Sequence, residues 1–172
     1  MYRTHTCGQL RKDDVGKTVE LAGWVSKRRN LGSIVFIDLR DRYGITQITF
    51  DEAHTEAIKD VRNEYVLWVK GEVSAKEVAN PKLETGEIEV LVKEVKVLNS
   101  SKTTPMIIAD ETDALEDLRL KYRYLDLRRP VLQKNLILRD KVTTIFRRVL
   151  HNHDFIEVET PILSKSTPEG AR

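Results

Sequence analysis

Cysteine and long apolar runs are scarce in this sequence, and both scarcities narrow the class of protein it can encode. Cys7 is the only cysteine among 172 residues, which excludes an internal disulfide framework and a cysteine-rich zinc site. No apolar run approaches the roughly 20 residues that a membrane-spanning helix needs. Residues 1–6 also lack the apolar segment of a secretory signal. We therefore expect a cytoplasmic protein with no membrane partner.

Recognisable catalytic motifs are missing as well. The sequence has neither a phosphate-binding loop of the Walker type nor a dinucleotide-binding fingerprint, and no nucleophile can be paired with a base. His151 and His153 lie two residues apart at one predicted helix end, far in sequence from His5 and Cys7. This spacing predicts no metal site. From the residues alone, the chain contains no complete active site.

Positive and negative charges nearly balance over the whole chain, but they are unevenly distributed along the sequence. The formal net charge is +2. Between residues 118 and 150, however, ten lysines and arginines are opposed only by Asp126 and Asp140, and Lys27-Arg28-Arg29 forms a second basic run. Such runs are often solvated faces, but local basic patches in a near-neutral chain also suit a polyanionic partner.

The first hundred residues have the pattern of a small barrel. Apolar side chains recur at alternate positions, the period of a half-buried strand, in residues 19–25, 33–40, 45–50, 65–73 and 87–97. Residues 51–62 instead have helical spacing, and Asp51 can cap the start of that helix. The phase of the last strand slips near Lys93-Glu94, which predicts a bulge. Three strands, a helix and two strands are the element order of an OB-fold, a five-stranded, partly open barrel.

The remaining residues do not suffice for a second complete domain. A polar segment around residues 99–105 is followed by a weakly structured acidic stretch. Residues 134–153 then predict an amphipathic helix and residues 154–161 a short strand. Roughly 55 residues after Leu118 are too few for an independent core. This part is therefore either an appendage of the barrel or the truncated start of another domain.

Three side chains of the barrel are candidates for contact with nucleic acid. OB-folds bind single strands through cations and exposed aromatic rings on one sheet face. Phe36 lies opposite the aliphatic set of its strand and could stack on a base, or it could pack under the helix or the second domain. Gln47 could pair with a base edge, although exposed glutamine is common. Arg29 closes the basic run in the first hairpin and could contact phosphate or base, or be an ordinary solvated arginine.

Two glutamates of the last predicted strand extend this set. Glu87 and Glu89 lie opposite its inward residues. A carboxylate can accept hydrogen bonds from guanine N1 and N2 or cytosine N4, so an acidic group among basic ones can tune the choice of base. From the residues alone, ordinary exposed strand glutamates explain this pattern better than a role in base selection.

Several segments resemble the bacterial aspartyl-tRNA synthetases, which are class II enzymes with an N-terminal OB-fold anticodon domain. These segments are residues 7–10, 23–25, 31–33, 36–42, 85–90, 121–130, 157–161 and 167–172. The barrel by itself is shared with asparaginyl and lysyl relatives. The aspartyl type is indicated by Tyr-Arg-Tyr-Leu-Asp-Leu-Arg-Arg at 122–129 and Thr-Pro-Glu-Gly-Ala-Arg at 167–172. The resemblance covers essentially the whole chain.

The resemblance implies a domain organisation. Residues 1–104 would be the OB-fold anticodon-binding domain and residues 105–133 a linker. Residues 134–172 would be the beginning of a class II α+β catalytic domain, with the helix and strand of motif 1. The expected fold is therefore mainly β with α, and the parent enzyme would be a homodimer.

The resemblance also implies roles for individual residues. Phe36 matches the position that stacks on the middle anticodon base, and Arg29, Gln47 and Glu89 match positions that contact anticodon bases. The motif 1 proline, Pro161, would lie at the dimer interface. The L-aspartate substrate would be bound in part by Glu169, which matches a glutamate of the family with that role.

The implied reaction is the ligation of aspartate to tRNA(Asp) through an aspartyl-adenylate, a step of protein biosynthesis that uses ATP and Mg²⁺. Class II motifs 2 and 3, which hold ATP, would lie beyond Arg172. We therefore expect this chain to bind tRNA without activating aspartate and without binding ATP or Mg²⁺ itself. The alternative is a stand-alone OB-fold protein that binds single-stranded nucleic acid. A motif-1-like helix ending in the 167–172 signature favours the first interpretation.

Overall fold

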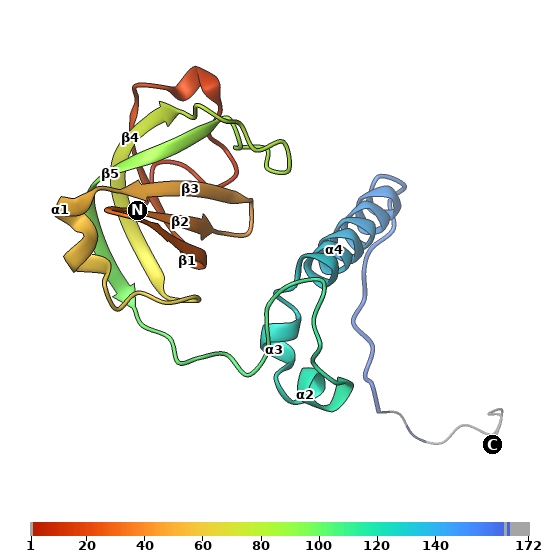
Figure 1. Ribbon diagram of the computed structural model, residues 1–172. Coiled ribbons are helices and arrows are strands. Elements are labelled where there is room, and N and C mark those ends of the chain that lie inside the picture. The colour runs from red at the N-terminus through yellow and green to blue at the C-terminus, as the bar shows by residue number, and fades with distance from the viewer. Residues whose placement is uncertain (1, 164, 166–172) are drawn as a thin grey trace. The chain divides into compact units, whose positions relative to one another are not determined.

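The computed structural model describes residues 2–163 and 165 (Figure 1). The chain divides into two compact units, Met1–Thr104 and Pro105–Arg172. The first unit is built mainly of strands and the second of helices.

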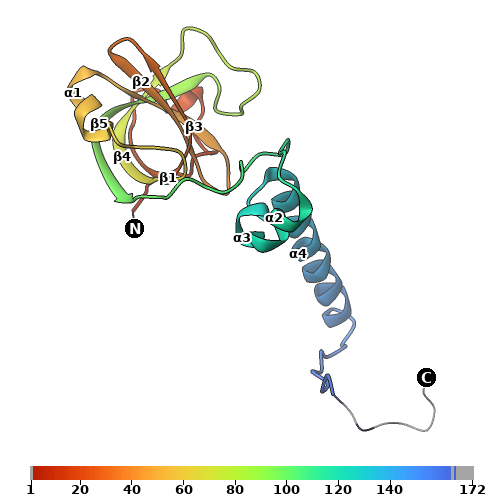
Figure 2. The ribbon, with the colours of Figure 1, turned by 60° about the horizontal axis from the view of Figure 1, so that its bottom comes forward.

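The first unit is a closed five-stranded barrel in which the strands are hydrogen-bonded in the order β1-β2-β3-β5-β4 (Figures 1 and 2). The strands are β1 (Thr18–Leu31), β2 (Ile34–Arg40), β3 (Ile45–Phe50), β4 (Val66–Ala75) and β5 (Ile88–Asn99). All neighbours are antiparallel except β3 and β5, which close the barrel through a short parallel seam at Ile48 and Val90. The predicted OB-fold is confirmed, with the barrel closed rather than partly open.

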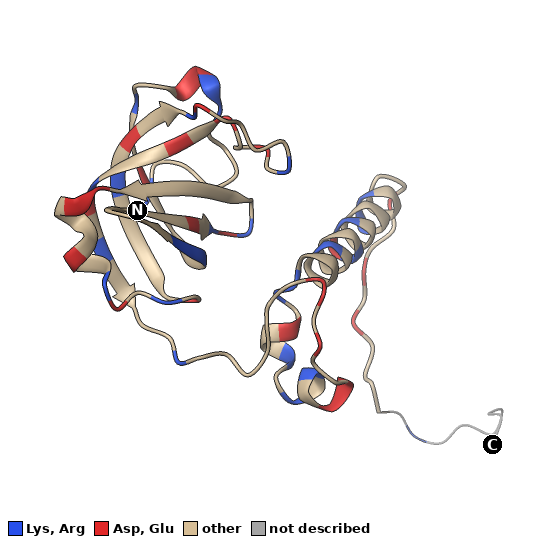
Figure 3. Ribbon diagram, in the orientation of Figure 1, with Lys and Arg blue, Asp and Glu red and all other residues tan. Residues whose placement is uncertain are grey.

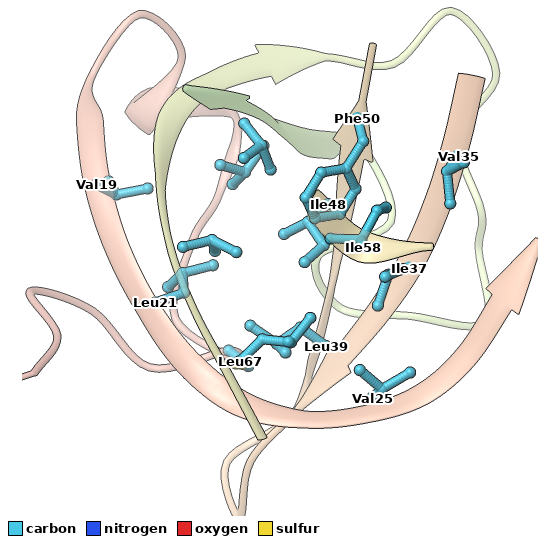
Figure 4. Close-up of a cluster of buried hydrophobic side chains, with 14 of the residues drawn as sticks. Val19, Leu21, Val25, Val35, Ile37, Leu39, Ile48, Phe50, Ile58 and Leu67 are labelled. Carbon is cyan, nitrogen blue, oxygen red and sulfur yellow. The ribbon is translucent and has the colours of Figure 1, made fainter. Parts of the chain in front are cut away.

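The core of the barrel follows the alternation in the sequence. Buried residues alternate with partly exposed ones along β2, β3 and β4, except at the exposed strand ends Ile34 and Ala75. Figure 4 shows the buried aliphatic side chains converging from all sides on the barrel interior around Phe50, together with Ile58 from the segment before β4. Full burial of one such side chain contributes about 1.5–3 kcal/mol to the stability of the folded state. The interior is therefore mainly apolar, and Thr46 of β3 is a buried polar exception whose hydroxyl donates to a backbone carbonyl.

The first hairpin is longer than the sequence predicts. β1 does not end at Val25 but continues through the basic run to Leu31, where Gly32, at φ +63°, begins the turn into β2. A register shift between Val25 and Lys27 marks a bulge, after which Arg29 pairs with Phe36. Backbone pairing with β2 keeps this polar segment in the sheet, although its side chains show no apolar alternation.

The predicted helix before β4 is shorter than expected. It consists of α1 (Glu52–Thr55) and the 3₁₀ turn η2 (Glu56–Ile58). Asp51 caps it as predicted, because its carboxylate accepts a hydrogen bond from His54 N at 3.2 Å. The predicted bulge in β5 is also confirmed. Lys70 pairs with Glu94 but the next residue, Gly71, pairs with Val92, which leaves an extra residue on β5.

The N-terminal segment, with the 3₁₀ turn η1 (Lys12–Asp14), packs against the β2–β3 turn. A Cβ on Gly8 would lie 2.1 Å from the carbonyl oxygen of Tyr43, so only glycine permits this approach. Cys7 is buried there, and its carbonyl accepts a 2.7 Å hydrogen bond from Thr46 Oγ1. Burial raises the pKa of the Cys7 thiol, which makes this cysteine part of the core rather than a reactive group.

The second unit contains α2 (Glu116–Lys121), α3 (Arg123–Asp126) and α4 (Pro130–His151). The segment expected to be a linker, 105–133, therefore holds two short helices and the first turn of α4. Asp126 organises it: this fully buried carboxylate accepts hydrogen bonds from Arg119 at 3.0 Å, Arg123 at 2.7 Å and Arg129 at 2.9 Å. The predicted basic face is thus partly a structural cluster around one acid.

The start of α4 and the segment that follows the helix both differ from the prediction. The helix starts at Pro130 instead of Lys134, because proline suits the first helical position and Asp110 Oδ1 accepts from Val131 N at 2.8 Å. Residues 154–161, expected as a strand, form none. No strand among the described residues pairs with this segment, and its Glu157 instead forms an ion pair with Arg147 on α4 at 2.8 Å.

Candidate nucleic-acid interface

The outer face of β1, β2, β3 and β5 brings together the four barrel residues that the sequence singled out. Arg29 on β1 pairs with Phe36 on β2, and residue 38 of β2 pairs with Gln47 on β3. Phe36 and Gln47 alternate with core residues, so they point away from the barrel interior. Arg29 lies beyond the buried part of β1 and is exposed. Glu89 on β5 joins them across the parallel seam, since Gln47 Nε2 donates to its carboxylate at 3.0 Å.

A hydrogen-bond network connects these side chains. Arg29 Nη2 donates to Asp38 Oδ1 at 2.6 Å and to Gln47 Oε1 at 3.3 Å. At its other end, the network closes on Glu89, which accepts from both Gln47 Nε2 and Thr49 Oγ1. The amide of Gln47 is therefore held with its oxygen toward the guanidinium and its nitrogen toward the carboxylate. A base edge that approaches this face meets donors and acceptors in a fixed arrangement.

The ring of Phe36 lies in this polar surrounding rather than in the core. Phe36 is partly exposed, and the side chains on either side of it along β2 at Val35 and Ile37 are buried. Its cross-strand neighbours are Arg29 and Thr49. An aromatic ring flanked by a cation and hydrogen-bonding groups provides a platform on which a base can stack.

Glu87 and Glu89, the two candidates for a base-selecting carboxylate, have different surroundings in the structure. Glu87 is exposed and precedes β5. Glu89 is partly buried and bonded to Gln47 and Thr49. Only Glu89 belongs to the network, so a base-selecting carboxylate would be Glu89.

Three residues of this face were missed in the sequence. The sequence did not single out Asp38 or Thr49, because their roles depend on the pairing of β2 with β3. Lys76 was assigned to no element, yet it is partly buried beside this network. Burial lowers the pKa of Lys76, the charges of Glu89 and Asp38 raise it, and Arg29 lowers it. The Lys76 ammonium group therefore interacts electrostatically with the charged side chains of this network.

The two candidate residues of the second unit do not form a site among the residues that the structure describes. Pro161 is exposed in the extended segment after α4, and Glu169 lies outside the described residues. Among the residues that the structure describes, no group of three or more His, Cys, Asp or Glu side chains could hold a metal ion. Within the same residues, no helix has the length and apolar content required to cross a membrane.

An exposed apolar surface lies on α4 and the segment that follows it. An open hollow there is lined mainly by Val142, Phe146, Leu150, Phe155 and Ile156. The rings of Phe146 and Phe155 are 67% and 62% exposed. Basic residues recur along the same helix (Figure 3). Exposed apolar surfaces of this size are uncommon on monomeric soluble proteins.

Family models match both units. A model described as an OB-fold nucleic acid binding domain matches residues 19–98. A second, described as tRNA synthetases class II (D, K and N), matches residues 115–172. The second match begins ahead of residue 134, where the sequence analysis placed the start of the catalytic domain, and it includes all three helices of the second unit.

Curated relatives match the chain over its full length. An aspartate–tRNA ligase of Mycoplasma mycoides is 53% identical over 172 residues, covering 100% of this chain and 30% of the relative. An aspartate–tRNA(Asp/Asn) ligase of Bacillus cytotoxicus is 55% identical over 176 residues, covering 99% of this chain and 30% of the relative. The chain thus spans about a third of the length of the curated relatives it matches.

Solved structures match both units together. The asparaginyl-tRNA synthetase of Pyrococcus horikoshii, complexed with asparaginyl-adenylate, superposes with a TM-score of 0.84 at 29% identity. The match covers 99% of this chain and 39% of that one. The aspartyl-tRNA synthetase of Entamoeba histolytica, at 21% identity and a TM-score of 0.84, shares the fold.

Proposed function

The chain belongs to the aspartate–tRNA ligase family of class II aminoacyl-tRNA synthetases, and on that basis we propose that its barrel binds the anticodon loop of tRNA(Asp). The observation that carries this proposal is the network on the outer face. Arg29, Gln47 and Glu89 come from three different strands and are linked by hydrogen bonds beside the partly exposed ring of Phe36.

Each of these residues has a distinct part in the proposed recognition. The ring of Phe36 stacks on the middle anticodon base. Gln47 and Arg29 contact base edges through an amide and a guanidinium whose positions the network fixes. Glu89 accepts hydrogen bonds from a base with exposed N–H groups, such as guanine N1 and N2. Single-stranded loops suit this mode of recognition because their bases can be turned outward.

For the whole protein we propose the ligation of aspartate to tRNA(Asp), with ATP and Mg²⁺ used to form the aspartyl-adenylate. Support comes from the class II match over residues 115–172. In the parent enzyme, Glu169 would contribute to binding of L-aspartate. The described residues do not fit a Mg²⁺ site, because they contain no suitable acidic cluster. No step of that reaction is therefore assigned to them, and the chain by itself is expected to bind tRNA without activating aspartate.

A comparison of two RNA stem-loops tests the anticodon proposal. The 172-residue chain is titrated with a stem-loop carrying GUC at the anticodon and with one whose loop is scrambled. We expect the GUC loop to bind about tenfold more tightly or better, since each base contact contributes about 1–3 kcal/mol of discrimination. Equal affinities, with the same strong salt dependence for both loops, would instead indicate a sequence-blind binder of single strands.

The second unit supports a further proposal, that two copies associate through α4 and the segment that contains Pro161. Four apolar side chains of one helix face are at least 49% exposed: Val142, Ile145, Phe146 and Val149. A second copy presents the same surface, and burying one surface against the other would remove both from water.

Association through α4 can be tested by light scattering. The chain is expected to have a mass of about twice the 19.8 kDa of one copy. Phe146→Glu should give monomers, because it puts a charge into the apolar interface. Thr144→Glu adds the same charge on the opposite side of the helix, given 3.6 residues per turn, and should leave the dimer intact. A monomeric parent chain, or equal masses for all three proteins, would contradict the proposal.

A further inference from the structure

We propose that Lys76 binds a backbone phosphate of the nucleic acid next to the nucleotide that Glu89 contacts. This inference rests on the proposed binding of an anticodon loop to the barrel, and it adds a residue outside the four that the sequence singled out. Lys76 would hold the strand in place without reading a base.

The position of Lys76 follows from the pairing of β4 with β5. Ser74 pairs with Glu89 and Ala75 with Ile88, and the ladder continues one step beyond β4, where Lys76 N donates to Glu87 O at 2.9 Å. Val73 is buried in the core. Because side chains alternate along an extended chain, Ser74 and Lys76 lie on the outer side, the same side as Glu89.

Unlike Arg29 and Glu89 on the same face, the Lys76 side chain has no hydrogen-bond or ion-pair partner among the described residues. Arg29 has Asp38 at 2.6 Å, and Glu89 has two donors. No described carboxylate is ion-paired with Lys76, although Glu89 and Asp38 act on it through their charge. Its partial burial disfavours the charged form, as the lowered pKa reflects. An anion bound at this point would offset that cost.

The chemistry of the side chain points to phosphate rather than to a base. A lysine ammonium is a compact charge on a flexible stem, whereas base edges are better matched by the planar fork of arginine or by amides. Proteins that bind single strands combine a stacking ring with cations that follow the phosphates. Phe36 provides the ring, and Arg29 and Lys76 are cations close to the Asp38–Gln47–Glu89 network.

Salt dependence of binding tests this role. The affinity of the 172-residue chain for the GUC and scrambled stem-loops is measured over a series of NaCl concentrations. For Lys76→Gln we expect both loops to bind several-fold more weakly, by the same factor. The slope of log K against log salt should become shallower by about 0.7, the value for one phosphate contact on a single strand. Lys76→Arg should restore the slope.

Lys96→Gln is the matched control. Lys96 is also on β5 but lies seven residues beyond Glu89, about 23 Å along a strand that rises about 3.3 Å per residue. Its ammonium stacks on the Trp68 ring. Loss of this charge should leave the slope unchanged, which separates a specific phosphate contact from the general effect of one positive charge.

Two results would overturn the proposal. If Lys76→Gln and Lys96→Gln have the same slope as the parent chain, Lys76 contacts no phosphate. If Lys76→Gln changes the ratio of affinities for the two loops, Lys76 instead reads a base or positions Glu89. Failure of the anticodon proposal is seen separately, in the parent chain, as equal binding of both loops.

Discussion

Asp126→Ala is expected to destabilise the helical unit by about 3–5 kcal/mol, the usual result of removing one partner from a buried ion cluster. The carboxylate is fully buried and accepts hydrogen bonds from three arginines. Of these, Arg129 is the most buried and also donates to the carbonyls of Ala109 and Asp110. Loss of the carboxylate would leave buried guanidinium charge without compensation and would release the start of α4.

Hydrogen exchange measures this effect separately in the two units. Amides of α2, α3 and α4 should lose protection in Asp126→Ala, while those of the barrel core should keep it, because the two units are separately compact. Asp140→Ala removes an exposed carboxylate from α4 and should change little. Equal loss of protection in both units would show that they unfold together, and unchanged protection in α2–α4 would show that the cluster is not needed.

The pH dependence of Asp126 has a definite sign. Burial raises the pKa of this carboxyl, but hydrogen bonds and charge from Arg119 and Arg129 lower it more, so the net shift is downward. Its contribution to stability is therefore present above the unfolded pKa of about 3.9 and is lost as pH falls through the lower folded value. The difference between the parent chain and Asp126→Asn should be constant near neutral pH and shrink below about pH 4.

The barrel could be predicted from the sequence because its determinants are local. Alternation of apolar residues in the five strands fixes which face is buried, and the helical spacing after Phe50 distinguishes this fold from a plain meander. The bulge near Lys93 also has a local signature, the slip in phase. The length of β1 was wrong, since pairing with β2 rather than side-chain pattern carries it to Leu31. The helix before β4 is also shorter than its spacing predicts.

The binding network and the arginine cluster could not be predicted in this way, because they depend on which distant residues meet. The sequence offers Arg29, Gln47 and Glu89 as three unrelated polar side chains, and only the register of four strands joins them. Resemblance indicated their roles but not that Asp38 and Thr49 hold them. Likewise, Asp126 was counted only as one of two acids in a basic stretch, although Arg123 and Arg129 lie three residues away on either side and can converge on it.

Phe36→Ala should weaken binding of the GUC stem-loop by about 1–3 kcal/mol, roughly 5- to 150-fold, which is the usual contribution of one base–aromatic stack. The slope of affinity against salt should not change, because stacking involves no phosphate, and this separates Phe36 from Lys76. Since Phe36 lies outside the core cluster, the barrel should remain folded.

The reason for a loss of binding can be resolved with three further variants. Ile34→Ala shortens another partly exposed side chain of the same face of β2, two residues away, and should have little effect. Phe36→Trp retains a stacking surface and should bind as the parent chain does, whereas Phe36→Leu retains apolar area without the ring and should not. If Phe36→Ala binds as tightly as the parent chain, Phe36 is not in the site. If Phe36→Leu binds like Phe36→Trp, the contact is apolar packing, and base reading would then depend on Arg29, Gln47 and Glu89 alone.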